Sequence, residues 1–338
     1  MGEWGIIAAL TGRMPAGPLT SVGIGDDAAV IGSPSGSVVA AVDLLLEGRH
    51  FRRDWSSAYD IGVKAAARSL ADIAAMGAVN TALLVALAVP GELPARWPLE
   101  LADGLASEAA RAGAGIVGGD TARADSVLLS VTALGDLAGR LPVLRSGARP
   151  GDVVAVAGPL GRSAAGLALL SAGVAVDAAP EAVAGLIAAH RRPAPPYAAG
   201  PEAAALGATA MIDVSDGLLA DLGHVADASA VALDLDSSSL VTGGPLSEAA
   251  ALLGPENSSS KRSGSYRTDP GSTPASIALE WVLTGGEDHS LVATFPASTP
   301  LPSRWRVIGQ VLAADGIDAG VTVDGAPHAG PPGWQHFR

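Results

Sequence analysis

The chain has 338 residues, of which 49% are hydrophobic and 4% aromatic, with a formal net charge of −13 and no cysteine. This length exceeds what one hydrophobic core usually fills, so two domains are expected. The negative charge argues against a nucleic-acid or anionic-membrane surface, and the lack of cysteine excludes disulfides, thiolate metal sites and cysteine nucleophiles.

The apolar runs of the sequence are too short to cross a membrane. The run "ALLVALAV" spans residues 82–89, whereas about 20 apolar residues are needed. No basic amino-terminal segment leads into an apolar stretch with a cleavage site, so we expect no secretory signal and a cytoplasmic protein. The two lysines, Lys64 and Lys261, do not lie in a Walker-type sequence, which excludes that kind of phosphate loop.

The first half of the chain alternates predicted strands and helices. Strands are expected at 38–44, 82–89, 115–121 and 126–135, and helices at 60–76 and 96–112. In the first helix, Asp60 is expected to cap the start and Gly77 to follow the end. Lys64, Arg68 and Asp72 are spaced by four residues, so Asp72 should project beside cations rather than into the core.

In the second half, a segment rich in Gly, Pro and Arg at 139–151 predicts a linker between domains 1–138 and 152–338. Beyond it we expect strands at 152–158, 231–236, 289–295 and 305–312, a glycine-entered helix within 159–173, and a strand, turn and helix over 211–229. The polar, low-complexity stretch 255–276 predicts a mobile surface insertion. The alternation predicts α/β or α+β domains.

Many carboxylates lie beside glycine turns or at predicted strand ends: Asp26, Asp27, Asp43, Asp120, Asp213, Asp216, Glu287 and Asp288, with Asp72 on its helix. Taken singly, each is typical of a turn or a helix cap. Two carboxylates about 4 Å apart repel by roughly 4 kcal/mol at an effective dielectric near 20, so a converging set needs cations. Oxygen ligands without cysteine or histidine at metal spacing favour Mg²⁺, which completes its shell with water and substrate phosphates.

Two glycine turns offer peptide N–H groups to a phosphate. They are "GGDT" at 118–121 and "GPLGRS" at 158–163, and each lies at the boundary of a predicted element. Arg145 is the cation that we expect to face a phosphate. Ordinary turns and a solvated linker arginine remain the alternatives for these features.

Eight motifs in chain order cover nearly the whole sequence. They are "GIGDDAAV", "DLLLEGRHF", "LADIAAMGA", "GGDT", "RSGARPGD", "MIDVSDGLLADL", "TGGEDHSL" and "GWQHF". Together they resemble the thiamine-monophosphate kinase family of the aminoimidazole-ribonucleotide-synthetase-like superfamily. The resemblance implies a homodimer whose amino-terminal domains form a barrel together, and a carboxy-terminal α/β domain. It also implies transfer of a phosphoryl group from ATP to thiamine monophosphate, the last step of thiamine diphosphate synthesis, with Mg²⁺ and K⁺ as the ions.

The resemblance also assigns residues. The implied metal ligands are Asp26, Asp27, Asp43, Asp72, Asp120, Asp213 and Asp216; the implied ATP contacts are Gly119, Asp120, Arg145 and Ser215; the implied substrate contacts are His50, Glu287 and Trp334. A phosphate monoester has a second pKa of about 6, so the acceptor is already largely ionised and no general base is expected. His50 is therefore expected to donate a hydrogen bond to the substrate, and Trp334 to stack on it.

The sequence departs from the family pattern in two places. Ala41 and Val42 replace the hydroxyl residues often found before Asp43, and His289 and Ser290 replace the usual Tyr and Glu of "GGEDYEL". Two alternatives stay open: another ATP-dependent enzyme of the same superfamily, or a non-catalytic relative that binds divalent cations or nucleotides.

Overall fold

The computed structural model describes residues 9–14, 17–24, 28–175, 180–257, 272–314 and 320–334; the side chains of 256 and 257 are not included. The chain divides into two compact units, Met1–Pro142 (unit 1) and Val143–Arg338 (unit 2). The division falls within the segment 139–151, all of which is described and contains no helix or strand. None of the helices in the described ranges is both long and apolar enough to span a membrane.

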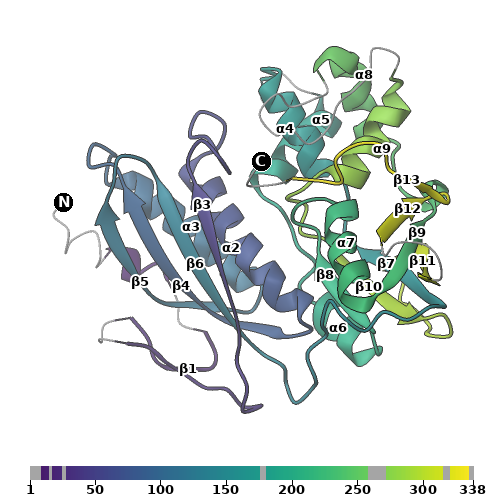
Figure 1. Ribbon diagram of the computed structural model, residues 1–338. Helices are drawn as coiled ribbons and strands as arrows, with labels where there is room; N and C mark the ends of the chain where they lie inside the picture. Colours follow the sequence, from purple (N-terminus) through teal and green to yellow (C-terminus); the bar gives the residue numbers. More distant parts are fainter. Residues whose placement is uncertain are drawn as a thin grey trace. The chain divides into compact units, whose positions relative to one another are not determined.

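Unit 1 is built on a four-stranded sheet (Figure 1). Its strands, in spatial order, are β3 (Val39–Leu46), β6 (Leu128–Asp136), β4 (Val79–Val89) and β5 (Gly115–Arg123). The β4–β5 pair is parallel and the other two pairs are antiparallel. Helices α2 (Ala58–Ala75) and α3 (Arg96–Arg111) pack together beside the sheet, and β1 (Thr20–Val22) pairs with β2 (Val30–Ile31).

The two faces of this sheet differ in how much their side chains are exposed to solvent. Leu83, Leu129 and Val131 are buried beneath the helices, as the period-two alternation of a strand requires. On the opposite face, Val42 and Leu44 are 64% and 51% exposed. In the described part of unit 1, this face of the sheet therefore carries exposed apolar side chains.

Helix α2 begins two residues earlier than predicted. Its N-cap is Ser57, whose Oγ accepts a hydrogen bond from the Asp60 N–H at 3.2 Å, while the Asp60 carboxylate accepts from the Ser57 N–H at 3.0 Å. The prediction that Asp60 caps the helix was wrong. Asp60 occupies the third helical position of a capping box, where its carboxylate accepts the N–H of the N-cap residue.

Unit 2 contains a seven-stranded sheet in the order β13 (Ala326–Pro327), β12 (Gly320–Val323), β9 (Val231–Leu235), β11 (Trp305–Ala313), β7 (Asp152–Ala157), β10 (Leu291–Pro296) and β8 (Ala210–Asp213). The β12–β9 pair is parallel and the other pairs are antiparallel. Both units thus mix sheets and helices, which confirms the predicted fold class.

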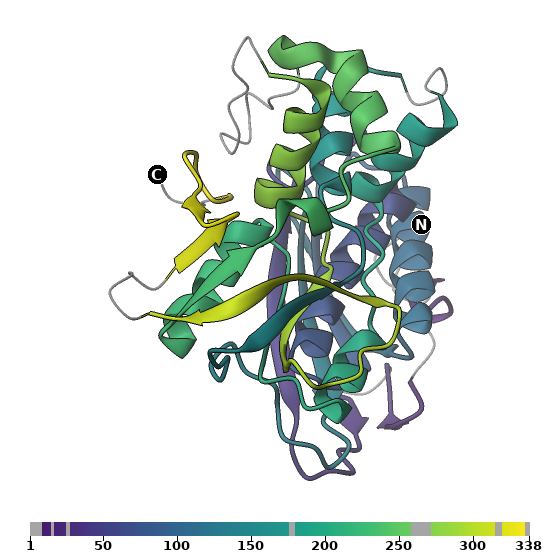
Figure 2. The ribbon, with the colours of Figure 1, turned by 90° about the vertical axis from the view of Figure 1, so that its right-hand side faces the viewer.

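The helices of unit 2 are α4 (Arg162–Ser171), α5 (Glu181–Arg191), α6 (Ala199–Ala205), α7 (Leu218–Ser229), α8 (Pro245–Asn257) and α9 (Pro274–Thr284), with a 3₁₀ turn at Ser237–Ser239. Helices α4, α5, α8 and α9 pack against one another and form one group in Figure 2. Gly161 enters α4 with a φ of 76°, and a Cβ there would lie 2.9 Å from the Val282 nitrogen of α9. Glycine is therefore required at this entry.

The predicted insertion at 255–276 is helical at both of its ends. Helix α8 runs to Asn257 across a kink at Gly254, and α9 begins at Pro274 behind a capping box formed by Thr273 and Ser276. Residues 258–271 lie outside the described residues. The predicted end of the insertion was wrong because Thr273, Pro274 and Ser276, which suggested low complexity, are also residue types that start a helix.

Candidate active site

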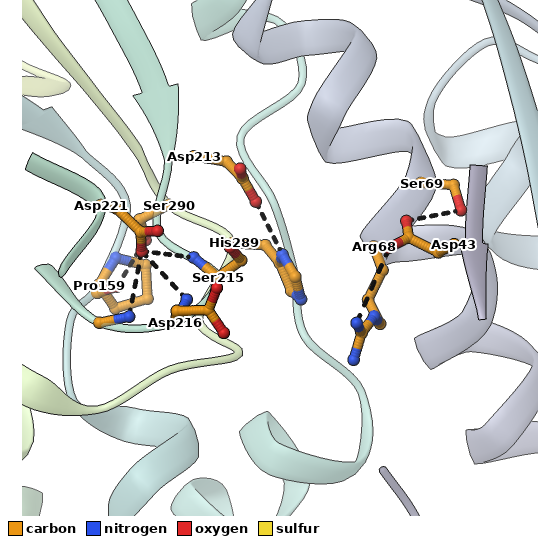
Figure 3. Close-up of polar contacts among 11 residues, drawn as sticks. Asp43, Arg68, Ser69, Pro159, Asp213, Ser215, Asp216, Asp221, His289 and Ser290 are labelled. Atoms are coloured by element: carbon orange, nitrogen blue, oxygen red, sulfur yellow. Dashed lines mark hydrogen bonds and ion pairs between the residues drawn. The ribbon is translucent and has the colours of Figure 1, made fainter. Parts of the chain in front are cut away.

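In unit 1, Asp43 is attached to helix α2. Its Oδ2 accepts a hydrogen bond from the Ser69 Oγ at 3.0 Å, and its Oδ1 lies 3.8 Å from the Arg68 guanidinium (Figure 3). Asp72 follows these two residues by three and four positions, so it lies on the same face of α2. The structure thus places the predicted ligands Asp43 and Asp72 on facing elements of one unit.

His50 lies just beyond β3 in a local hydrogen-bond network. Its Nδ1 accepts from the Leu46 N–H at 3.0 Å, and its carbonyl accepts from the buried Lys64 Nζ at 3.0 Å. Because Nδ1 is an acceptor, a neutral imidazole carries its proton on Nε2. This arrangement agrees with a role in which Nε2–H donates a hydrogen bond to the substrate, and it differs from the arrangement of a general base.

Gly119 and Asp120 lie on strand β5 at the far edge of the same sheet. A Cβ on Gly119 would lie 2.0 Å from the Val85 carbonyl oxygen, so only glycine permits this approach of β5 to β4. The Asp120 Oδ1 accepts from the Thr121 N–H at 2.8 Å. Both residues border a pocket whose apolar lining includes Leu87, Leu101 and Leu105.

The strand register keeps Asp43 and Asp120 apart. Asp43 pairs with Val131, Val131 with Val85, and Val85 with Gly119, so three strand spacings separate Asp43 from β5. These spacings amount to about 14 Å, and Asp120 is one residue further on, pointing to the opposite face. Unit 1 of one chain therefore does not bring these two carboxylates together. The predicted ligands Asp26 and Asp27 lie outside the described residues.

In unit 2, the turn between β8 and α7 is held by Asp221. A single oxygen of this carboxylate accepts the backbone N–H groups of Ser215, Asp216 and Gly217 at 2.9, 3.0 and 3.0 Å (Figure 3). Burial raises the pKa of Asp221 well above its ordinary value, and the charges of Asp213 and Asp216 raise it further, against the lowering effect of the backbone hydrogen bonds.

This crowding of carboxylates fits a cation. The charges of Asp213 and Asp216 disfavour the charged form of Asp221, and a bound Mg²⁺ would offset that repulsion with the oxygen ligands it prefers. Among the described residues, no group of three or more His, Asp or Glu side chains is arranged to hold a metal by itself. The carboxylates present can therefore supply part of a ligand shell, which water and phosphate oxygens would complete.

The loop of residues 285–290, between α9 and β10, is anchored at every side chain from Glu287 to Ser290. Glu287 lies 3.5 Å from the His190 Nδ1, which also lies 3.0 Å from the Ser163 Oγ. The Ser290 Oγ donates to the Pro159 carbonyl at 2.5 Å. Glu287 has a φ of 63°, a left-handed conformation that is uncommon for a residue with a side chain.

Asp288 and His289 complete this set of anchors. Asp288 accepts from the Gly161 and Ser163 N–H groups at the start of α4, at 2.5 and 2.8 Å. The His289 Nδ1 lies 3.0 Å from the Asp213 Oδ2 (Figure 3). Burial raises the pKa of Asp288 to about 7, although its hydrogen bonds to Ser163 and Gly161 and the nearby Arg162 charge oppose the shift.

These contacts correct one expectation. The peptide N–H groups of "GPLGRS" do not form an open phosphate cradle, because the buried Asp288 already accepts those of Gly161 and Ser163. Likewise, the Ser215 N–H is bonded to Asp221, so a contact of Ser215 with ATP would involve its side chain.

The carboxy-terminal segment brings Trp334 to the same turn. The Trp334 N–H donates to the Asp216 carbonyl at 2.9 Å, and the Ala220 N–H donates to the Pro332 carbonyl at 3.2 Å. The Glu287 N–H donates to the Ser215 carbonyl at 2.8 Å. Unit 2 therefore brings together the predicted residues Asp213, Ser215, Asp216, Glu287 and Trp334.

Arg145 lies in an exposed stretch near the start of unit 2. Ser229, the last residue of α7, holds this stretch: its Oγ donates to the Arg145 carbonyl at 3.2 Å and accepts from the Gly147 N–H at 3.1 Å. The guanidinium is thus presented from a backbone that is held in place, as a phosphate contact requires.

No role was predicted for three side chains that organise unit 2, namely Asp221, His190 and the imidazole of His289. Each acts on a residue distant in the sequence or on a turn that precedes it. The segment "SDGLLAD" that ends at Asp221 was the one local signal, since an acidic residue in the first turn of a helix can reach back to its start.

Comparisons with known proteins agree on one family. Residues 25–137 match the family model described as AIR synthase related protein, N-terminal domain, and residues 149–259 match the corresponding C-terminal domain. A thiamine-monophosphate kinase of Mycobacterium tuberculosis is 48% identical over 340 residues, covering 100% of this chain and 92% of the relative.

Solved structures give the same picture. The thiamine-monophosphate kinase of Stenotrophomonas maltophilia K279a is similar with a TM-score of 0.79 and 32% identity, covering 97% of this chain and 98% of that one. AaThiL, complexed with AMPPCP and TMP, is similar with a TM-score of 0.76 and 29% identity, covering 99% and 97%.

Proposed function

The chain belongs to the thiamine-monophosphate kinase family of AIR-synthase-related proteins, and we propose that it converts thiamine monophosphate to thiamine diphosphate by direct transfer from ATP. The observation that carries this proposal is the 48% identity to a thiamine-monophosphate kinase over the full chain. A structural relative that covers 99% of the chain was solved with AMPPCP and TMP, an ATP analogue and the acceptor. This full-length match favours the kinase over other enzymes of the superfamily.

We propose Mg²⁺ as the cofactor, with K⁺ as a second ion. The proposed Mg²⁺ ligands are Asp43, Asp72 and Asp120 in unit 1 and Asp213 and Asp216 in unit 2. Their support is the oxygen-only donor set and the pKa of Asp221, which is raised by burial and then by the charges of Asp213 and Asp216. When bound, Mg²⁺ neutralises phosphate charge and so lets two polyanions approach.

The chain's own residues would orient the substrates. In the proposed reaction, a terminal phosphate oxygen of thiamine monophosphate attacks the γ-phosphorus of ATP and ADP leaves, with no proton to remove from the largely ionised acceptor. The Nε2–H of His50 and the guanidinium of Arg145 are suited to phosphate oxygens, and the pocket beside Gly119 and Asp120 has room for an apolar ring. Trp334 offers a flat face for the cationic thiamine.

We also propose a homodimer and a cytoplasmic location, where ATP is supplied. The support for the dimer is the face of the unit 1 sheet on which Val42, Leu44 and Leu84 are 64%, 51% and 37% exposed. An apolar sheet face of this kind is typical of a surface that another subunit covers. Sedimentation at several concentrations tests the dimer.

A coupled assay of ADP release tests the function. With Mg²⁺ and ATP, thiamine monophosphate should stimulate ADP release, whereas free thiamine, which lacks the acceptor phosphate, should not. Equal stimulation by free thiamine would overturn the assignment. ATP binding without any release of ADP in the presence of thiamine monophosphate would favour a non-catalytic relative.

A further inference from the structure

His289 is the residue of the 285–290 loop that contacts a proposed metal ligand. The residue is 2% exposed, and its Nδ1 lies 3.0 Å from the Asp213 Oδ2 (Figure 3). Asp213 itself is 4% exposed. The pair is therefore shielded from water that would compete for either group.

The chemistry of the two groups sets the direction of this hydrogen bond. An ionised carboxylate only accepts hydrogen bonds, so the imidazole must donate its Nδ1–H to Oδ2. Oδ1 then remains as the Asp213 oxygen for another partner. The His289 Nε2 is buried and has no hydrogen-bond partner in the described part of the chain, so the Asp213 contact is the polar interaction that orients the ring there.

The backbone holds the two side chains in register. The His289 N–H donates to the Val214 carbonyl at 2.9 Å, and the Val214 N–H donates to the Ser290 carbonyl at 2.8 Å. Beyond the loop, Leu291 of β10 pairs with Asp213 of β8. The backbones that carry the imidazole and the carboxylate are thus hydrogen-bonded neighbours, which keeps the two side chains close together.

We propose that His289 is a positioning residue of the metal site: by holding Oδ2 of Asp213, it presents Oδ1 to the cation. This inference rests on the proposed function, in which Asp213 is a Mg²⁺ ligand. Groups that orient metal ligands in this way commonly contribute 10- to 100-fold to metal affinity. A purely structural histidine would instead contribute to stability and leave metal affinity unchanged.

Two amide variants separate the nitrogens of the ring. In His289→Asn the side-chain N–H₂ can occupy the place of Nδ1 and donate to Asp213, and Asn tolerates the φ of 52° at this position. In His289→Gln the amide reaches the place of Nε2 and does not reproduce the donor. Both changes keep a polar side chain, and His289→Leu provides a variant with no donor at all. Ser290→Ala is the matched control, because it removes the neighbouring anchor to Pro159 and leaves the Asp213 contact in place.

The test titrates each full-length variant with Mn²⁺ alone and follows free Mn²⁺ by electron paramagnetic resonance. We expect His289→Gln and His289→Leu to weaken Mn²⁺ binding about tenfold or more, and His289→Asn and Ser290→Ala to stay within about threefold of wild type. Wild-type affinity in His289→Gln or His289→Leu would overturn the proposal, and so would a loss in His289→Asn and Ser290→Ala as large as that in His289→Leu. If His289→Gln does not fold, as judged by its melting curve, the comparison of His289→Asn with His289→Leu decides.

The assay of ADP release separates this inference from the function on which it rests. The positioning role would stand and the kinase would be rejected under one combination of results. In it, the Mn²⁺ affinities of His289→Asn and His289→Gln differ as expected, but wild type shows no ADP release that depends on thiamine monophosphate. If wild type is active but substitutions at residue 289 leave the Mn²⁺ affinity unchanged, the kinase would stand and the positioning role would be rejected.

Discussion

The buried carboxylate of Asp288 predicts a pH-dependent stability that one substitution should remove. Asp288 accepts two N–H groups at the start of α4, and burial raises its pKa from 3.8 to about 7. In Asp288→Asn the carboxamide retains one acceptor oxygen and resembles the protonated acid, but it cannot ionise. The variant should therefore preserve the fold while losing the titration.

The sign of the effect follows from proton linkage. Because the pKa of Asp288 is higher in the folded protein than in the unfolded chain, the folded state binds more protons, and the free energy of unfolding decreases as the pH rises from about 4 to about 7. Between pH 5 and 7, a slope that falls from about 1.36 kcal/mol per pH unit to about half of that at the pKa gives about 2 kcal/mol lost by wild type relative to the variant. Above pH 7 the difference should become constant.

Urea denaturation from pH 5 to pH 8 measures this difference. Trp281 is fully buried on α9, and its backbone carbon lies 3.0 Å from where a Cβ on Gly161 would be, so its fluorescence should report on this region. The difference in unfolding free energy between Asp288→Asn and wild type should grow with pH and level off near 7. Parallel curves for the two proteins would refute the reasoning.

Three further substitutions test other parts of the molecule. Asp43→Asn keeps an acceptor for Ser69, so the melting temperature should hold while ADP release falls by about 100-fold or more; near-normal turnover would contradict a metal role. Trp334→Ala should raise the KM for thiamine monophosphate about 2- to 30-fold, from a stacking energy of about 0.5–2 kcal/mol, and an equal change in the KM for ATP would reject stacking. Ser57→Ala breaks the capping box with Asp60 and should cost about 1 kcal/mol in urea denaturation, whereas Ser57→Thr should not; equal stability of the two variants would count against the cap.

Local sequence patterns predicted the regular elements well where a single period ran through a segment. The strand at 38–44 is observed at Val39–Leu46, and the helix at 96–112 at Arg96–Arg111. Boundaries failed where one residue type serves two purposes. Asp60 was assigned to the cap rather than to the third helical position, and Thr273–Ser276 was assigned to an insertion rather than to the start of α9.

The candidate site shows a different limit. The sequence identified Asp213, Asp216 and Glu287 by their motifs, but it could not identify which groups would already be bonded to one another. The N–H groups of Gly161 and Ser163 looked available to a phosphate, yet Asp288, more than 120 residues away, accepts both. Such pairings depend on which strands and loops become neighbours, and no local pattern encodes that.

The sequence by itself determined the family of this protein and the chemistry of its donors, because ordered motifs and the absence of cysteine restrict both without reference to geometry. Only the tertiary structure decided how those donors are used. Strand register separates Asp43 from Asp120, and the pairing of β10 with β8 sets His289 against Asp213. The physical reason is that hydrogen bonding and burial act over distances in space, and the chain fixes those distances only when it folds.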